Sequence, residues 1–390
     1  MTGETIVKTK LIPTFVALAW LSLLASPLAS SAANLVVTNL ADSGPGTLRS
    51  AITNATSGAV ITFDPSLSGE TITLSNTLTI NTNLTIDASA LPGGLQINGK
   101  GYIQIFNVAS NMTVFLNSLT ITNANGIYSG YFGGGIFNAG TLTLNQCILS
   151  GNTAGGGGGG GGGIDNYFGG TLTLNQCTLS GNSAPYGSGG GIDNDEGAAT
   201  IRNTIVAGNS GSMDIYNYSA TLTYGGSNLI QSVDNVDGFI TGPAPLTYAP
   251  DLAPLGNYGG LTQTMPPLPG SPAIGAGSVA VNIFATDQRG YPRTQNGLID
   301  IGAVELQPPA ANPPVLKNIT VPAGGGDGLQ FTFTNAPAAD FTVLAATDVL
   351  LALTNWTVLG EVQQLAPGQY QFTDPQAATN LVRFYRVRSP

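Results

Sequence analysis

The carboxylates best placed to do chemistry occupy the same position in two neighbouring repeats. Asp165 lies in the sequence Gly-Gly-Gly-Ile-Asp-Asn, and Asp193 lies in a second copy of it. If the repeats stack, the two carboxylates lie one turn apart, which fits the separation of about 5–10 Å between the two acids of a glycoside hydrolase. Asp195 and Glu196 follow closely, so these four residues are also the best candidate Ca²⁺ site. Solvated loop carboxylates with neither role are the simpler alternative.

Aromatic residues flank the glycine-rich segments on the same side of the predicted repeats. Nine consecutive glycines, residues 155–163, have no side chains to bury and therefore predict a mobile loop at one edge. Aromatic side chains on a loop edge favour a surface for contact with sugars or proteins, with packing over the loop bases as the alternative. The predicted binding residues are Tyr128, Tyr131, Phe132, Tyr167, Phe168 and Tyr186.

Charge argues against several classes of function. The chain has 11 Lys and Arg, 21 Asp and Glu, and no His, which gives a formal net charge of −10. Such a protein is a poor binder of nucleic acid, and the absence of His removes the most frequent general base. The scarcity of basic residues also argues against a polysaccharide lyase that acts on polyanions. The sequence therefore favours a protein without catalysis and without a cofactor, apart from the candidate Ca²⁺ site.

A repeat of about 30 residues must position these side chains. Residues 140–152 read GTLTLNQCILSGN, and residues 170–182 read GTLTLNQCTLSGN. Self-similarity at this period is typical of stacked solenoids, and the apolar period of two within each unit predicts strands. Leu142, Leu144 and Leu149 should face inward. Because crossovers between parallel strands are right-handed, the sequence predicts an all-β fold with a right-handed parallel β-helix of about eight turns.

Polar and thiol side chains should stack along this solenoid. Asparagine tolerates the left-handed backbone of a corner, and its amide can bond to the amide one turn above. The cysteines occupy equivalent positions in adjacent repeats and export would permit a disulfide, but in-register side chains suit its dihedral angle badly, which favours two buried thiols. The predicted ladder consists of Asn117, Asn145, Asn175 and Asn203, with Cys147 and Cys177.

Composition shifts divide the chain into four parts. Residues 1–33 have a basic start, an apolar run and a small-residue cleavage site, as a secretory signal peptide does. Residues 34–305 form the β-helix, with a helix near residues 47–52 capping its first turn. Residues 306–315 are a proline-rich linker, and the alternating strands in residues 316–390 predict a small antiparallel β-sandwich. No apolar stretch in the mature chain is long enough to be a transmembrane segment.

Several motifs resemble those of exported bacterial β-helix proteins. Gly-Gly-Ile at residues 134–136 and 162–164, with Gly-Asn-x-Ala at residues 151–154 and 181–184, resembles the repeats of the polymorphic outer-membrane-protein family. Residues 287–293 (DQRGYPR) and 300–305 (DIGAVE) resemble the end of a choice-of-anchor Q domain. Residues 316–390 resemble a C-terminal β module of exported verrucomicrobial proteins. These resemblances imply a passenger that is secreted or displayed at the cell surface.

These features together predict an exported, non-enzymatic surface or envelope protein. Its β-helix should display loops for adhesion or for contact with a matrix, and its partner should be an extracellular glycan or a surface protein. The alternative from another class is a carbohydrate-active enzyme, a neutral-polysaccharide hydrolase or lyase, with Asp165 and Asp193 as its catalytic pair.

Overall fold

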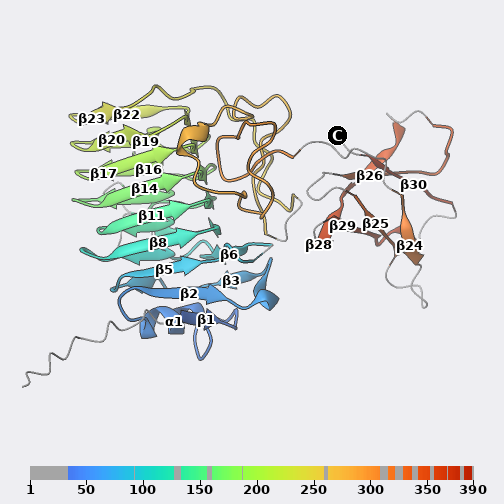
Figure 1. Ribbon diagram of the computed structural model, residues 1–390, viewed down its shortest axis with the longest axis horizontal. Coiled ribbons are helices and arrows are strands. Elements are labelled where there is room, and N and C mark those ends of the chain that lie inside the picture. Colours follow the sequence, from blue (N-terminus) through green and yellow to red (C-terminus); the bar gives the residue numbers. More distant parts are fainter. Residues whose placement is uncertain are drawn as a thin grey trace, which may run out of the picture. The chain divides into compact units, whose positions relative to one another are not determined.

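The computed structural model, drawn in Figure 1, describes most of the chain after residue 33. In the described residues nearly all regular structure is β-strand, and no helix there is long and apolar enough to cross a membrane. The described residues are 34–91, 93–126, 133–155, 160–186, 188–258, 262–307, 315–320, 328–335, 341–351, 355–366, 368–377 and 382–388.

Residues 34–241 form a parallel β-helix in which each complete turn adds one strand to each of three sheets (Figure 1). Sheet 1 contains β1 (Asn34–Val37), β2 (Ala59–Phe63), β5 (Leu84–Asp87), β8 (Thr113–Asn117), β11 (Thr141–Asn145), β14 (Thr171–Asn175), β17 (Ala198–Arg202), β20 (Thr221–Tyr224) and β23 (Phe239–Thr241). Sheet 2 contains β3 (Thr71–Thr73), β6 (Leu95–Asn98), β9 (Leu119–Thr122), β12 (Ile148–Ser150), β15 (Thr178–Leu179), β18 (Ile205–Val206) and β21 (Leu229–Ile230). Sheet 3 contains β4 (Leu78–Ile80), β7 (Phe106–Val108), β10 (Ile136–Asn138), β13 (Ile164–Tyr167), β16 (Gly189–Asp195), β19 (Met213–Tyr218) and β22 (Val233–Val236).

The interior of the solenoid follows the alternation of the repeat. Leu144 pairs with Leu174 in the next turn, and both side chains are fully buried in one continuous apolar core. Thr141 lies outside on the same strand and is exposed. The predicted parallel β-helix is therefore confirmed, although it has seven three-stranded turns and not eight.

The first turn is covered by a short helix, α1 (Leu48–Asn54). The Thr47 hydroxyl accepts a hydrogen bond from the Ser50 backbone N–H, as an N-cap residue does. Leu48 and Ile52 then join the buried core. A 3₁₀ turn, η1 (Pro65–Leu67), follows β2.

After Thr241 the solenoid continues only as a single parallel bridge between Leu246 and Leu229 of sheet 2. The described part of residues 242–307 holds a 3₁₀ turn, η3 (Val279–Val281), and isolated bridges in place of strands. It runs back along the outside of sheet 2, as the orange trace beside the stacked strands in Figure 1 shows. Ala303 N donates to the Thr178 hydroxyl at 3.0 Å, and Thr120 donates to the Gln263 carbonyl at 3.1 Å. The solenoid therefore ends well before residue 305, and this return segment (residues 242–307) covers one of its sheets.

Several strands of sheet 2 also carry apolar side chains on their outer face, which explains why the sheet needs a cover. Leu149 points into the solenoid core, whereas its neighbour Ile148 points outward and is equally buried. Outside the sheet, Ile148 packs in a second cluster with Val304 of the return segment, and Ile205 packs in a third with Ile301. Burial of such outward side chains stabilises each by about 2 kcal/mol.

The corner between sheets 1 and 2 holds part of the predicted asparagine ladder. Asn145 donates to Asn117 and Asn175 donates to Asn145, both at 2.9 Å. Asn203 does not continue this ladder, because Arg202 pairs with Asn175 and donates to it at 3.3 Å. In the other three turns the left-handed backbone falls one residue after the asparagine, as at Gln146, whose φ is 52°, whereas Asn203 adopts it itself, with a φ of 46°.

Two further asparagine ladders line the other corners. Every member except the last donates its side-chain amide to the asparagine of the next turn, at 2.6–2.7 Å in the first ladder and 2.9 Å in the second. They comprise Asn138, Asn166, Asn194, Asn217 and Asn235, and Asn152, Asn182 and Asn209. Cys147 and Cys177 are both buried and free, and burial raises the pKa of the Cys177 thiol to about 12.

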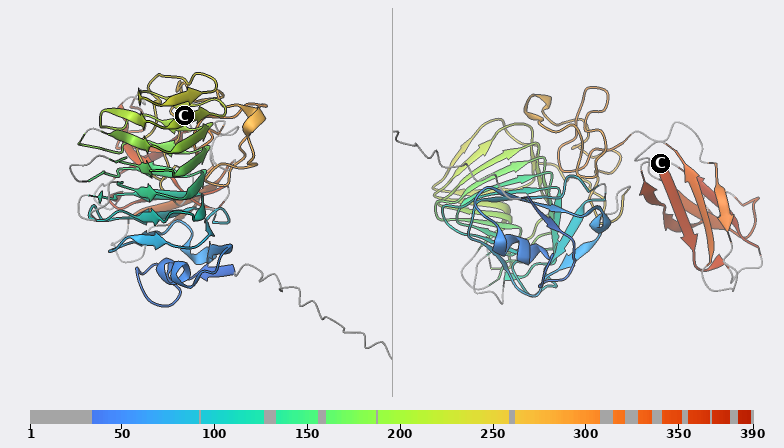
Figure 2. Two further views of the ribbon diagram at one scale, coloured as in Figure 1. Left: turned by 90° about the vertical axis from the view of Figure 1, so that its left-hand side faces the viewer. Right: turned by 60° about the horizontal axis from the view of Figure 1, so that its bottom comes forward.

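The C-terminal module consists of two antiparallel sheets, visible at the right of the second view in Figure 2. One sheet has the order β24 (Lys317–Thr320), β25 (Leu329–Thr334), β29 (Gln369–Asp374), β28 (Gln363–Ala366), and the other β27 (Thr357–Glu361), β26 (Thr342–Ala346), β30 (Phe384–Arg388). Phe331 and Phe333 from the first sheet share a buried core with Val343 from the second. The predicted antiparallel sandwich is confirmed, and residues 308–314 of the predicted linker lie outside the described residues.

Candidate functional site

Runs of glycine position the two candidate carboxylates on sheet 3. The backbone N–H of Gly134 donates to the Gly161 carbonyl at 2.9 Å, and that of Gly162 donates to the Gly189 carbonyl at 3.2 Å. A Cβ atom added to Gly162 would lie only 2.3 Å from the Gly190 oxygen, so this ladder requires glycine. Residues 160–163 are therefore a buried part of the solenoid and not a mobile loop, while residues 156–159 lie outside the described residues.

Asp165 and Asp193 are direct neighbours across this sheet. They pair in register between β13 and β16, where adjacent backbones lie about 4.8 Å apart. Their side chains are only 1% and 5% exposed. Asp193 Oδ2 accepts a hydrogen bond from Gly160 N at 3.1 Å, but Asp165 Oδ2 and Asp193 Oδ1 have no hydrogen-bond partner. The two acids thus form a close, buried and partly unsatisfied pair.

The surroundings of the pair favour protonation. Burial raises the pKa of Asp165 well above its usual range, and the nearby charge of Asp193 raises it further. Burial also raises the pKa of Asp193, to about 6, against hydrogen bonds from Ser188 and Gly160. No basic residue occurs between Lys100 and Arg202 to compensate the charge. Burial and mutual repulsion therefore oppose the simultaneous ionisation of both acids.

The other two acids of the predicted Ca²⁺ cluster do not join this buried pair, although the charge of Asp195 adds to the burial that raises the pKa of both Asp165 and Asp193. Asp195 is half-buried at the end of β16, and Glu196 is exposed in the turn that follows, with a φ of 50°. Among the described residues, no three or more His, Cys, Asp or Glu side chains gather closely enough to hold a metal ion. The four-residue cluster that the sequence predicts is therefore not brought together.

The structure describes three of the six predicted aromatic residues, and all three are exposed. Tyr167 is 37% exposed and Phe168 is 66% exposed, and their ring centroids lie 6.0 Å apart at the end of β13. Tyr186 is 63% exposed in the turn before β16. The remaining predicted residues, Tyr128, Tyr131 and Phe132, lie outside the described residues.

Three aromatic residues on the same sheet were missed in the sequence. Phe137 lies 5.6 Å from the Tyr167 ring, and the rings of Tyr216 and Tyr218 are nearly parallel, with centroids 6.3 Å apart and an angle of 6°. The sequence pattern could have indicated their position, because Ile-Tyr-Asn at residues 215–217 repeats the Ile-Asp-Asn pattern of the preceding turns.

These rings and carboxylates form two columns across successive turns of sheet 3. Asp195 pairs in register with Tyr167 in the turn before and with Tyr218 in the turn after. Beside this column, Asp193 pairs with Asp165 before and Tyr216 after. We refer to the outward side chains of this surface as the ring–carboxylate face, which comprises Phe137, Tyr167, Phe168, Asp195, Tyr216 and Tyr218.

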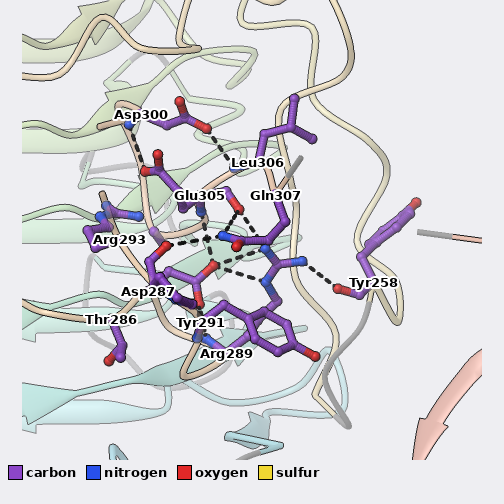
Figure 3. A network of polar contacts seen from close by, with 12 residues as sticks. Tyr258, Thr286, Asp287, Arg289, Tyr291, Arg293, Asp300, Glu305, Leu306 and Gln307 are labelled. Carbon is purple, nitrogen blue, oxygen red and sulfur yellow. Dashed lines mark hydrogen bonds and ion pairs between the residues drawn. The ribbon is translucent and has the colours of Figure 1, made fainter. Parts of the chain in front are cut away.

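A second cluster of charged residues lies in the return segment and is shown in Figure 3. Arg289 forms an ion pair with Asp287 at 3.0 Å, with side chains only 3% and 0% exposed. Asp287 also accepts from Glu305 N at 3.0 Å, and Glu305 accepts from Asp300 N at 2.8 Å (Figure 3). These bonds tie together two stretches of the return segment, so the cluster serves to hold that segment in shape.

Burial governs the charge of this network. It raises the pKa of Glu305 to about 8, and the neighbouring charge of Asp300 adds to that effect. Burial also raises the pKa of Asp300 and lowers that of Arg293, which is fully buried. When Glu305 is protonated and neutral, the network holds two acids, Asp287 and Asp300, and two arginines, Arg289 and Arg293. Its negative and positive groups are then equal in number.

Comparisons with known proteins do not assign the chain to a family. No model of a protein family matches it, and no curated protein matches it. The choice-of-anchor Q and verrucomicrobial resemblances therefore rest on their motifs alone, and what stands is the architecture: a parallel β-helix followed by a small antiparallel sandwich.

Proposed function

We propose that this protein is exported and acts, without catalysis, at the cell surface or envelope by presenting one face of its β-helix for adhesion or matrix contact. The ring–carboxylate face of sheet 3 carries the proposal. Sheet 2 is covered by the return segment, and sheet 1 presents threonines such as Thr141 and Thr171. Sheet 3 exposes aromatic rings on neighbouring strands, which favour contact with a partner, whereas the exposed rings of sheet 1, Phe115 and Phe239, lie several turns apart on β8 and β23.

The signal-like residues 1–33 support the exported location. The test is to produce the full chain in a bacterial host, separate the cellular fractions, and determine the N-terminus of the product. We expect a protein that begins near Asn34 and occurs in the envelope or medium, where added protease reaches it. A full-length product confined to the cytoplasm would contradict the proposal.

A second candidate function, hydrolysis of a neutral polysaccharide, is favoured by the Asp165–Asp193 pair. Its in-register pairing places the two acids at a spacing that suits a retaining mechanism, in which one carboxyl group is the acid and the other the nucleophile. Against it, the two side chains are only 1% and 5% exposed, which leaves substrate little access. Release of reducing sugar that disappears in both Asp165→Asn and Asp193→Asn would establish the hydrolase. Absence of products from a panel of neutral polysaccharides is expected for the surface role.

A further inference from the structure

We propose that the ring–carboxylate face is a binding site for a neutral glycan chain that runs along the solenoid axis, an inference that rests on the proposed surface function. Its centre is a column of three side chains from successive turns, Tyr167, Asp195 and Tyr218, which pair in register. The two tyrosines are therefore separated by two strand spacings, on the order of 10 Å.

The rings match the apolar part of a sugar. A pyranose presents flat patches of C–H groups, which pack against the faces of aromatic side chains, while its hydroxyls need polar partners. Tyr167 and Tyr218 are 37% and 38% exposed, so part of each side chain faces solvent. Tyr216 lies next to Tyr218, with ring centroids 6.3 Å apart and nearly parallel planes, and Phe137 and Phe168 lie next to Tyr167. Each tyrosine of the column therefore has further aromatic area beside it, and we call the two groups the upper and lower platforms.

The carboxylate between the platforms matches the hydroxyl groups. Asp195 is half-buried, and burial together with the charge of Glu196 raises its pKa. A partly desolvated carboxylate accepts strong hydrogen bonds from neutral O–H donors. A sugar that bonds to Asp195 would have its two neighbours in the chain over the tyrosine platforms.

Charge decides which glycans fit. No Lys, Arg or His occurs between residues 101 and 201, which span the lower platform and Asp195. Asp234, paired in register with Tyr216, adds a further acid beside the upper platform. A uronate or sulfated chain would therefore meet only like charge on this face, whereas a neutral chain meets no repulsion.

The test is affinity electrophoresis of the purified protein through gels that contain β-glucan, xylan, mannan, galactan or dextran, with polygalacturonate and alginate as polyanions. We expect retardation by at least one neutral polysaccharide and by neither polyanion. Tyr218→Ala and Tyr167→Ala should each weaken binding and raise the dissociation constant at least tenfold. Tyr218→Trp should retain binding because it keeps an aromatic ring. The matched control is Tyr248→Ala, which removes a 68% exposed tyrosine away from this face.

Each outcome decides the inference. Because both tyrosines are exposed, their alanine variants should melt like the wild type, so lost binding reports on the face itself. Retardation by no neutral polysaccharide, retardation only by the polyanions, or unchanged binding in the alanine variants would each overturn the glycan site. Failure here with a correct envelope location would leave the proposed surface function standing, whereas a cytoplasmic product would remove that function independently.

Discussion

Replacing Glu305 by Gln should make the protein less sensitive to rising pH. In the folded chain, burial and Asp300 raise the pKa of Glu305 from 4.5 to about 8. The folded state therefore keeps a proton that the unfolded chain loses above about pH 4.5. Between these two values, the folded state binds up to one proton more, so the free energy of unfolding falls as pH rises, by at most ~1.4 kcal/mol per pH unit.

The structure also sets the size of the effect. From pH 5.5 to 7.5 this residue alone should lower the free energy of unfolding by up to ~3 kcal/mol. Glutamine has the same shape, stays neutral, and its carbonyl oxygen can still accept the bond from Asp300 N, which is 2.8 Å long in the wild type. Glu305→Gln should thus remove most of this contribution. The raised pKa values of Asp165, Asp193 and Asp300 act in the same direction and leave a residual slope.

The assay is denaturant unfolding at pH 5.5, 6.5 and 7.5, followed by circular dichroism. Glu70→Gln, which changes an exposed carboxylate of the solenoid, is the control and should keep the wild-type dependence. If Glu305→Gln shows the same slope as the wild type, Glu305 is ionised in the folded protein and the reasoning about its burial is wrong.

Two further substitutions test the packing of the solenoid. Gly162→Ala places a Cβ 2.3 Å from the Gly190 carbonyl oxygen and should lower the free energy of unfolding by on the order of 4 kcal/mol. The control Gly169→Ala meets no atom within 4 Å but has a φ of +82°, and should lower it by only about 1 kcal/mol. Equal melting temperatures of the two variants would refute the glycine ladder. Leu144→Asp buries an unpaired charge in a fully buried position and should abolish cooperative unfolding. The control Thr141→Asp, on the exposed side of the same strand, should melt near the wild-type temperature. Similar melting of both variants would contradict the inward orientation of Leu144.

The repeat pattern was sufficient to predict the fold and the pairing of the two candidate acids. In a solenoid each turn contacts mainly its neighbours, so local alternation and repeat length determine the register. Leu144 and Leu174, or Asp165 and Asp193, pair as their repeat positions predict. The predicted position of Asn203 in the ladder was wrong because the turn before β17 is one residue shorter than the asparagine spacing implies. Arg202 and not Asn203 therefore pairs with Asn175.

Only the tertiary structure revealed which faces of the solenoid remain open. The return segment lies far along the chain from the strands it covers: Gln288 donates to Thr120 across 168 residues. No local repeat encodes such a contact. The strands of sheet 2 that are apolar on both sides, such as β18, look in the sequence like ordinary short core strands. The same holds for the ring–carboxylate face, because Tyr167, Asp195 and Tyr218 become neighbours only when turns of unequal length are stacked. Local alternation thus determined what each strand buries, and contacts between distant segments decided which surfaces are left to bind a partner.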